Sequence, residues 1–375
     1  MAKPRPSSSA SAKKQTTVVV LGPGQMGLVC AGLLAADQVA PGRKSRGSKP
    51  AVPPTARNIR VILWGHDRDE IATLTQTRKS KRLEGFLLPK EVELITDDAQ
   101  ALRNADVIVS AIPVQHMREA WTRLAKNVPP QACVVSVAKG IEMKTLLRPT
   151  QIIADVLRKT GVDDPDKKPR SLAVLSGPTI AAELARFLPA TMIVASDDPE
   201  FAARLQKLFT TRWMRIYTHN DVLGVEIAGA CKNVIAIAAG VVDGLKAGNN
   251  AKSALLSRGL AEIVRLGVYM GASPDTFFGI AGIGDLATSC FSPEGRNRSC
   301  GEALGKGMKL EAFLAKTGST VEGVWTTKAV VKLARKYKVE MPITEAVRRT
   351  LFNDHDPIDG IAGLMAREMK SERVR

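Results

Sequence analysis

Two adjacent polar residues interrupt the inner part of a long apolar stretch, and one of them is a lysine. The stretch, residues 222–242, has the length and spacing of a buried helix, and Lys232 and Asn233 lie near its middle. An ammonium group is seldom buried without a partner, because removing its water is costly. Two interpretations remain open. Either the amine reaches water at a helix end or cleft edge, or it is a general acid and base whose proton affinity is lowered by desolvation and a cationic neighbour.

A glycine-rich loop near the start of the chain has the spacing of a dinucleotide-binding turn. The β-branched strand Thr16–Leu21 leads directly into G-x-G-x-x-G, and a helix is predicted over residues 25–36. Gly22 would form the tight turn, Gly24 would let a pyrophosphate approach the backbone, and Gly27 would allow close packing of strand and helix. The free N–H groups of the helix N-terminus favour an anion. A purely structural glycine turn is the alternative.

The second predicted strand, Ile59–Trp64, ends where such domains bind the adenosine ribose. Asp67 at this end could bind a ribose hydroxyl, whereas His66 and Arg68 could accept a 2′-phosphate, so the sequence leaves NAD and NADP both open. The basic, Pro/Gly/Ser-rich residues 41–57 separate this strand from the first and are predicted to be a loop insertion.

Further chemistry-bearing residues follow later buried strands. These strands are predicted over residues 106–113, 132–138 and 171–176. Strands that alternate with helices predict an α/β fold with a doubly wound, mainly parallel sheet of the Rossmann type. Ligands bind past the carboxyl ends of such strands, so Lys139, Gly177 and Thr179 are expected at the same edge as the glycine loop.

The chain changes character near residue 219, where Ala- and Leu-rich helices begin. We expect a disordered basic tail at 1–15, a dinucleotide-binding domain at 16–218 and an all-α substrate and catalytic domain at 219–375. The helices are predicted over residues 221–242, 251–270, 275–281, 298–305, 310–316, 326–337 and 343–352. Two loops there contain residues that could act in binding or catalysis. Asp285 lies in a glycine-rich turn, and Arg296 and Asn297 are adjacent, as suits a phosphate. An exposed surface charge is the alternative interpretation of Arg296.

The composition argues against a membrane-spanning protein, a zinc protein and a dedicated nucleic-acid-binding protein. Of 375 residues, 45% are hydrophobic, and no uninterrupted apolar run has the roughly 18 residues that a membrane span needs. The five cysteines form no CxxC pair, which favours a reducing cytoplasm without a zinc site, and Cys231 is better explained as a buried filler than as a nucleophile. The formal charge of +17 suits an anionic substrate, while no recognition pattern predicts specific nucleic-acid binding.

Taken together, the segments resemble the NAD(P)-dependent sn-glycerol-3-phosphate dehydrogenases of the soluble bacterial type. The matching strings run in order from about Thr17 to the C-terminal helices, and they include VVVLGPGQMG, AKGIE, LSGPT, GVEIAGACKNVIAIAAG, GIGDL, GRNRS and VEGV. The chain departs from the family pattern at Gln25-Met26 in the first loop, at Gly295 where the family has Ser, at Thr320 where Val is usual, and at Thr179 for Ser.

The resemblance implies a role for each matching residue. The expected catalytic residues are Lys232 as proton donor and acceptor, Lys139 and Asp285. The expected substrate-binding residues are Lys139, Gly177, Thr179, Asn233, Gly295, Arg296 and Asn297. The expected cofactor-binding residues are Gly22, Gly24, Gln25, Met26, Gly27, His66, Lys139, Ala181, Arg296, Thr320 and Glu322. The implied activity is reversible reduction of dihydroxyacetone phosphate to sn-glycerol 3-phosphate with NAD or NADP, which would supply the phospholipid backbone, and a homodimer is one expected assembly.

In the expected mechanism the amines of Lys232 and Lys139 have different roles. Lys232 would deliver the proton, and Lys139 would stabilise the developing oxyanion and, as a like charge, ease the deprotonation of Lys232. Asp285 would orient Lys232, and Arg296 would hold the remote phosphate. Two alternatives stay open: another dehydrogenase with a Rossmann and a helical domain, of the β-hydroxyacid or ketopantoate type, and a non-catalytic protein that binds nucleotides or polyanions.

Overall fold

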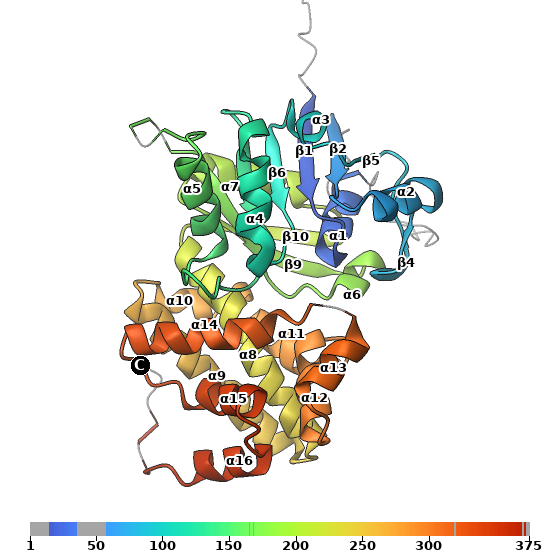
Figure 1. The fold of residues 1–375 in the computed structure, drawn as a ribbon. Coiled ribbons are helices and arrows are strands. Elements are labelled where there is room, and N and C mark those ends of the chain that lie inside the picture. The colour runs from blue at the N-terminus through green and yellow to red at the C-terminus, as the bar shows by residue number, and fades with distance from the viewer. Residues whose placement is uncertain are drawn as a thin grey trace, which may run out of the picture.

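The computed structural model describes residues 15–35, 58–164, 166–167, 169–318, 320–369 and 371–372. A sheet covered by helices forms one half of this described chain, and helices form the other half (Figure 1). The fold class expected from the sequence is therefore confirmed. The predicted tail, except Gln15, and the predicted insertion at 41–57 lie outside the described residues.

Within the described residues the main sheet has eight strands in the order β10-β9-β8-β7-β6-β1-β2-β5. Neighbouring strands pair in parallel, except for the antiparallel pair of β8 and β9. The strands are β1 (Thr16–Leu21), β2 (Ile59–Trp64), β5 (Glu93–Ile95), β6 (Val107–Ser110), β7 (Cys133–Ser136), β8 (Leu172–Ser176), β9 (Ala190–Ser196) and β10 (Met214–His219). All five predicted strands are present, whereas β5, β9 and β10 were not predicted.

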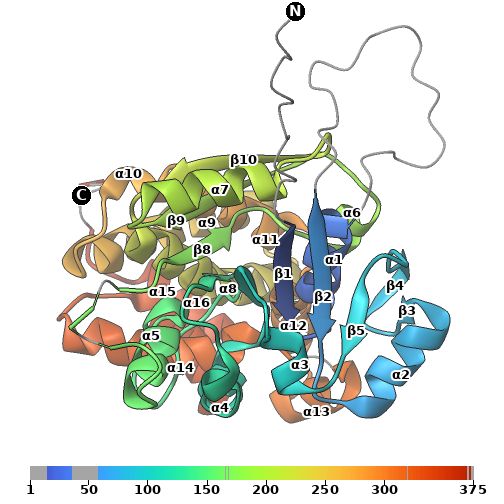
Figure 2. The ribbon, with the colours of Figure 1, turned by 90° about the horizontal axis from the view of Figure 1, so that it is seen from above.

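Helices cover both faces of the sheet, which is why its inner strands are nearly continuous runs of apolar residues. Val18 and Val20 of β1 share a core with one layer of helices, and Val19 and Leu21 share a core with the other. The first layer is α1 (Gln25–Ala35), α2 (Arg68–Thr77), α6 (Ala181–Ala185) and α7 (Pro199–Phe209); the second is α3 (Asp98–Leu102), α4 (Val114–Leu124) and α5 (Pro149–Lys159). Figure 2 shows α7 and α5 on opposite sides of the strands.

Two short elements complete the sheet-containing half. A hairpin of β3 (Lys79–Ser80) and β4 (Leu83–Leu87) follows α2, and a single 3₁₀ turn (Ala125–Asn127) follows α4. The hairpin lies beside the glycine-rich loop, because the Gln25 side-chain amide donates a hydrogen bond to the Arg82 carbonyl at 2.8 Å.

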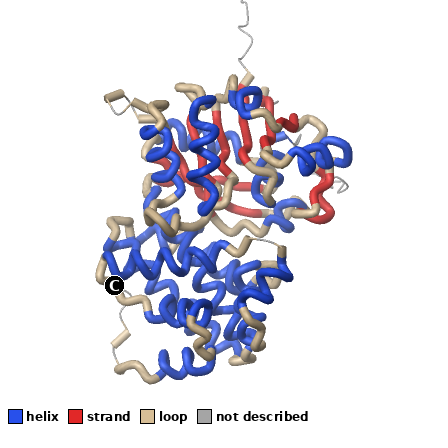
Figure 3. The backbone as a smooth tube through the Cα atoms, viewed as in Figure 1, coloured by secondary structure: helices blue, strands red, loops and turns tan. Residues whose placement is uncertain are grey.

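Among the described residues, the strands gather in one half of the molecule and the other half consists of helices and loops (Figure 3). This helical half is built around α8 (Val222–Gly244), which is buried along nearly its whole length. The other helices are α9 (Gly248–Tyr269), α10 (Pro274–Phe277), α11 (Asp285–Phe291), α12 (Arg296–Gly305), α13 (Leu310–Thr317), α14 (Glu322–Lys336), α15 (Pro342–Phe352) and α16 (Pro357–Met365). Helix α8 is long and apolar enough to cross a membrane, but 94% of its most apolar window is buried inside the protein. Burial of this kind is typical of a core helix.

Glycines bring the α8 and α12 backbones into direct contact. A Cβ atom on Gly240 would lie 1.9 Å from the Arg298 carbonyl oxygen, and one on Gly301 would lie 1.9 Å from the Ile237 carbonyl oxygen. No side chain fits in either place. This contact fixes the N-terminus of α12 beside the middle of α8, where Lys232 and Asn233 lie.

The predicted helices of this half are present, but one of them is shorter than expected, and the structure contains two helices that were not predicted. The helix expected at 275–281 ends early as α10, and a π-helical turn (Ile280–Gly284) follows it. Helices α11 and α16 were not predicted. The glycine-rich segment before Asp285 gives no 3.6-residue apolar period, so the sequence favoured a turn there instead of the start of α11.

Candidate active site

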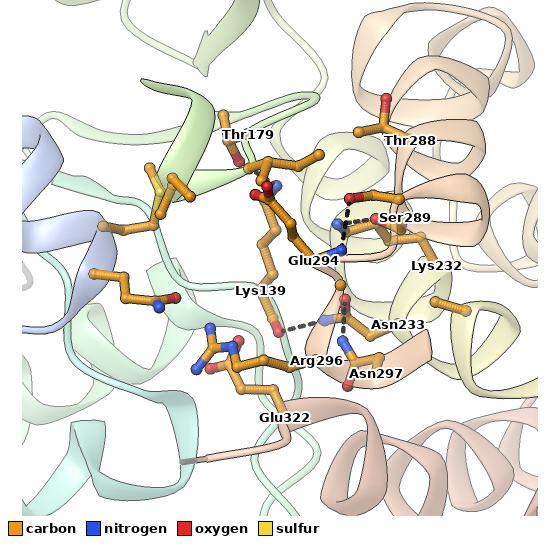
Figure 4. Close-up of a pocket in the computed structure, with 18 of the residues that line it drawn as sticks. Lys139, Thr179, Lys232, Asn233, Thr288, Ser289, Glu294, Arg296, Asn297 and Glu322 are labelled. Atoms are coloured by element: carbon orange, nitrogen blue, oxygen red, sulfur yellow. Dashed lines mark hydrogen bonds between the residues drawn. The ribbon is translucent and has the colours of Figure 1, made fainter. Parts of the chain in front are cut away.

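A pocket of about 180 Å³ lies between the ends of the sheet strands and the helical half (Figure 4). Its lining comes from the starts of α1 and α6, from the segments after β7 and β8, from α8, α11, α12 and α14, and from the segments that precede α12 and α14. The lining residues are Gln25, Met26, Val137, Lys139, Thr179, Ile180, Ala181, Ala182, Lys232, Asn233, Ala236, Thr288, Ser289, Ser292, Glu294, Gly295, Arg296, Asn297, Thr320 and Glu322.

One buried carboxylate joins two lysines in this pocket. Asp285 accepts a hydrogen bond from Lys232 Nζ at 2.7 Å on Oδ1 and from Lys139 Nζ at 2.7 Å on Oδ2. Only 1% of Asp285 is exposed. Two ammonium groups and one carboxylate leave an excess of one positive charge at the bottom of the pocket when both amines carry protons. A negative substrate or a developing oxyanion would be stabilised there.

The remaining partners of the two amines differ. Lys139 Nζ also donates to the Gly177 carbonyl at 2.9 Å and to Thr179 Oγ1 at 3.1 Å, whereas Lys232 Nζ also contacts Ser289 Oγ at 2.6 Å. Figure 4 shows the two side chains entering the site from different elements, Lys139 after β7 and Lys232 on α8. The Gly177–Thr179 loop therefore supports Lys139, and α11 supports Lys232.

Burial lowers the pKa of Lys139 to about 8. The negative charge of Asp285 opposes this shift, while the positive charge of Lys232 adds to it. At neutral pH Lys139 is protonated, but it releases its proton far more easily than an exposed lysine. Burial has the opposite effect on the carboxyl of Glu322, which also lines the pocket: it raises the pKa of this group. The positive charge of Arg296 and a hydrogen bond from the Val114 N–H oppose that rise.

A network of ion pairs stabilises the loop that carries Lys139, because Glu142 in this loop is paired with Arg118. Arg118 of α4 forms a two-pronged ion pair with Glu142 at 2.9 Å and reaches Asp155 of α5 at 2.6 Å. Paired guanidinium and carboxylate groups of this geometry are strong and directional. On the other side Gly229 of α8 packs closely against Ser176, because a Cβ there would lie only 3.2 Å from Ser176 Oγ, whereas its 3.5 Å distance to Lys139 Cγ would be an ordinary contact.

Two asparagine amides link the site to three helices. Asn233 Nδ2 donates to the Lys139 carbonyl at 3.2 Å, and Asn297 Nδ2 donates to Asn233 Oδ1 at 2.9 Å. The Gly323 N–H then donates to Asn297 Oδ1 at 3.0 Å. This chain of hydrogen bonds ties the Lys139 loop to α8, α12 and α14. Each amide nitrogen keeps a second N–H with which it can contact a ligand.

The N-terminus of α12 forms the cationic end of the pocket. Gly295 is its N-cap residue, and Arg296 begins the helix with an exposed side chain whose Nη1 donates to the Thr320 carbonyl at 3.1 Å. Free backbone N–H groups at a helix N-terminus and an adjacent guanidinium both favour a phosphate. Gly295 supplies no side chain, so the backbone and Arg296 provide the anion-binding groups here.

The glycine-rich loop has the geometry that a dinucleotide requires. Gly22 has a φ of +104°, in the left-handed region that favours glycine. A Cβ on Gly27 would lie 1.9 Å from the Gly22 carbonyl oxygen, so only glycine permits this packing of α1. Apart from its two neighbours in the chain, no atom of the described residues lies within 4 Å of a Cβ on Gly24, which leaves this face of the loop open to a ligand. The residues present fit a bound dinucleotide.

The other expected cofactor residues are divided between the pocket and the rim of the sheet. Gln25, Met26, Ala181, Thr320 and Glu322 line the pocket. His66 lies outside the pocket lining, exposed after β2, with its ring 6.5 Å from that of Trp64.

Comparisons with known proteins identify the family. The family model described as NAD-dependent glycerol-3-phosphate dehydrogenase N-terminus matches residues 17–202, and the corresponding C-terminus model matches residues 221–362. The chain belongs to the NAD-dependent glycerol-3-phosphate dehydrogenases. The chain is 41% identical over 360 residues to glycerol-3-phosphate dehydrogenase [NAD(P)+] of Thermobifida fusca, which covers 96% of this chain and 99% of the relative.

A second relative and a solved structure support the same assignment. Glycerol-3-phosphate dehydrogenase [NAD(P)+] of Bacillus pumilus is 44% identical over 308 residues, covering 82% of this chain and 87% of the relative. The crystal structure of glycerol-3-phosphate dehydrogenase from Coxiella burnetii superposes with a TM-score of 0.83 at 30% identity, covering 94% of this chain and 99% of that one. A ketopantoate reductase from Ralstonia eutropha shares only the fold, with a TM-score of 0.54 and 14% identity.

Sequence reasoning missed four polar residues of this dehydrogenase site. Ser289 contacts Lys232, while Thr288, Ser292 and Glu294 also line the pocket. Ser289 follows Asp285 by four residues, the spacing that places two side chains on one face of a helix. That spacing could have identified Ser289 if α11 had been predicted.

Proposed function

We propose that this enzyme reversibly reduces dihydroxyacetone phosphate to sn-glycerol 3-phosphate, with Lys232 as the proton donor. Bound NADH or NADPH supplies the hydride. The observation that carries the proposal is the pair of lysines held by Asp285, because Lys232 is buried yet hydrogen-bonded to a single carboxylate and a hydroxyl. General acid and base catalysis of this kind contributes roughly 10²–10⁴-fold to a rate.

Lys139 and Asp285 assist Lys232 in different ways. The protonated Lys139 stabilises negative charge on the substrate's C2 oxygen, and Asp285 keeps both amines oriented toward the pocket. Arg296, Asn297 and the N-terminus of α12 bind the phosphate, so that binding energy remote from the reacting carbon positions the carbonyl. In the reverse direction Lys232 accepts the proton from the C2 hydroxyl.

The assay is oxidation of NADH and of NADPH with dihydroxyacetone phosphate, followed by the loss of the reduced cofactor's ultraviolet absorbance. Dihydroxyacetone and a panel of β-hydroxyacid-type and ketopantoate-type substrates are run in parallel. Lys232→Ala should cut turnover by roughly 10²–10⁴-fold and leave the cofactor dissociation constant nearly unchanged. Near-normal turnover of this variant would move the proton donor elsewhere, and preference for another substrate would overturn the proposed reaction.

Three finer statements belong to the same proposal. The chain divides at about residue 219 into a cofactor-binding part and a catalytic part. If this division is right, substitutions in the glycine-rich loop should change cofactor affinity, whereas Lys232→Ala should change turnover and leave cofactor affinity nearly unchanged. Assembly as a homodimer is tested by light scattering of the purified chain. A cytoplasmic role in supplying glycerol 3-phosphate for phospholipids is tested by whether the gene restores glycerol-independent growth to cells that lack this activity.

A further inference from the structure

A second carboxylate that joins two cations lies behind the phosphate end of the pocket. Asp243, near the C-terminal end of α8, accepts hydrogen bonds from Lys252 Nζ of α9 at 2.9 Å on Oδ1 and 2.8 Å on Oδ2. Its Oδ2 also accepts a hydrogen bond from Arg298 Nε of α12 at 2.6 Å. None of these three residues, here called the Asp243 cluster, lines the pocket. The cluster joins three helices of the helical half (Figure 1).

The Asp243 cluster is largely removed from water. The exposed fractions of its side chains are 7% for Lys252, 15% for Arg298 and 21% for Asp243. Lys252 Nζ also lies 4.8 Å from the centre of the Phe291 ring at the end of α11, where the face of the ring attracts a cation. Hydrogen bonds between charged groups are strong and directional, and breaking a buried pair leaves an uncompensated charge. The cluster therefore resists any displacement of α8, α9 and α12 relative to one another.

The contact between α8 and α12 depends on such directional bonds. Glycines set the distance between the two helices, and a Cβ on Gly244, for example, would lie 2.4 Å from the Glu302 carbonyl oxygen. Dispersion contacts of this kind are individually weak and have no preferred direction, so they limit the approach of a helix more than its rotation. Hydrogen bonds have a preferred geometry. The bonds that Asn297 and Arg298 donate to α8 therefore fix the rotation of α12 about its own axis.

The rotation of α12 matters because the groups that face the phosphate belong to the same first turn. Successive residues of an α-helix are about 100° apart around its axis, so Arg296 and Arg298 point in nearly opposite directions. Arg298 is held on the side of α8, while Arg296 lines the pocket together with the N-terminus of the helix. A misplacement of about 1 Å that begins far from the reacting atoms can cost a rate roughly 10²-fold.

We infer that Asp243, Lys252 and Arg298 are positioning residues for the phosphate of the substrate, a conclusion that rests on the proposed function. Lys252 binds both oxygens of the Asp243 carboxylate and so orients Oδ2 toward Arg298. Arg298 in turn holds the first turn of α12 in the rotation that presents Arg296 to the pocket. Loss of the cluster should weaken the part of catalysis that depends on the phosphate and leave the rest of the site in place.

The test compares kcat/KM for dihydroxyacetone phosphate with kcat/KM for unphosphorylated dihydroxyacetone. The ratio of the two constants measures what the phosphate contributes, and a loss of folded enzyme cannot change it, because that loss lowers both constants equally. Arg298→Met removes the guanidinium while Asp243 keeps Lys252 as its partner, so no buried charge is left alone. We expect the ratio to fall about tenfold, mainly through a higher KM for the phosphorylated substrate, and the dissociation constant of NADH to stay within about threefold.

Two further variants of α12 separate positioning from a general loss of charge. Arg298→Lys keeps a cation that can face Asp243 and should retain the wild-type ratio within about threefold. Lys306→Met is the matched control, because Lys306 also forms an ion pair on α12, with Glu302 at 2.6 Å, but at the C-terminal end of the helix. Its ratio should equal that of the wild type. If Arg298→Met does not fold, Lys252→Met takes its place, because Asp243 then keeps Arg298 but loses the bonds that orient it.

An unchanged ratio in Arg298→Met, or in Lys252→Met where that variant replaces it, would overturn the inference. An equal fall of the ratio in Lys306→Met would also overturn it, because the effect would then belong to any charge on α12. If the wild type used dihydroxyacetone as well as its phosphate, the proposed function and the inference would fail together. If the wild type preferred the phosphate and Arg298→Met kept that preference, only the inference would fail.

Discussion

Replacing Asp285 by Asn tests whether one carboxylate controls both amines of the site. The substitution keeps the shape of a side chain that is 1% exposed but removes the charge that faces Lys139 and Lys232 at 2.7 Å each. Two ammonium groups would then share a buried pocket without the carboxylate that joins them, and Glu322 would be the acidic group left in the pocket lining. The less costly outcome is that one of them releases its proton.

The size of the effect follows from the contacts. A hydrogen bond to a charged group contributes about 1.5–3 kcal/mol, and one pKa unit corresponds to about 1.4 kcal/mol. Burial already lowers the pKa of Lys139 to about 8, with Asp285 opposing the shift. Without that opposition we expect this pKa to fall by about one to two further units. At pH 8 Lys139 would be largely neutral, and the reduction rate should drop by roughly 10²-fold.

The assay is the pH dependence of kcat/KM for reduction of dihydroxyacetone phosphate. In the wild type the rate should decline as pH rises through about 8, because Lys139 then loses its proton. In Asp285→Asn the decline should begin at a lower pH. Asp243→Asn is the control, since Asp243 also joins two cations, Lys252 at 2.8 Å and Arg298 at 2.6 Å, but does not line the pocket. It should lower the melting temperature and leave the pH midpoint in place.

Two results would refute this reasoning. One is an Asp285→Asn enzyme whose rate stays within about threefold of the wild type across the pH range. The other is a shift of the pH midpoint that Asp243→Asn reproduces, because the shift would then report a general loss of charge and not the pairing inside the pocket.

Arg296→Ala should raise the KM for dihydroxyacetone phosphate about tenfold or more with a smaller change in kcat, because one guanidinium contact to the phosphate is lost. An equal loss of kcat/KM with unphosphorylated dihydroxyacetone would contradict that role. Glu262 of α9 is buried, and its carboxylate accepts the Ile343 N–H at the N-terminus of α15 at 2.6 Å. Burial raises the pKa of Glu262 to about 7. The folded state therefore holds a proton that the unfolded state releases, so stability should fall as pH rises from about 5 to 7. Glu262→Gln should abolish this slope in melting temperature, and an unchanged slope would assign it to other groups.

The local parts of the fold could be predicted because they depend on neighbouring residues. The run Thr16–Leu21 followed by three spaced glycines specifies a strand, a turn and a helix within a few residues, and the structure places all three there. Lys139 was expected at the carboxyl end of a parallel strand, which is where β7 ends. Strands β9 and β10 lie almost wholly within residues 16–218, which were assigned to the dinucleotide-binding domain, but neither run was recognised as a strand, although β9 contains the β-branched residues Thr191, Ile193 and Val194.

The contacts that make the site are long-range, and spacing alone does not reveal them. Asp285 is 146 residues from Lys139 and 53 from Lys232, and only the closure of the sheet-containing half on the helical half brings the three together. The resemblance to a family identified these residues, but not that one carboxylate joins both amines. The N-cap that Asp67 forms for α2 was predictable from local sequence, since an Asp followed three residues later by Glu is a helix-start pattern.

In the proposed mechanism, the position of the charges would couple substrate binding to proton transfer. Lys139 comes from the sheet-containing half, and Asp285 and Lys232 come from the helical half, so the ion pair between Lys139 and Asp285 exists only when the two halves are in contact. Asn233 makes a second link of the same kind through the Lys139 carbonyl. Arg296 and Asn297 are tied to α8 through the same asparagine. A phosphate bound at the N-terminus of α12 therefore acts on the element that also positions Lys232, and a substrate without the phosphate would lose orientation as well as affinity.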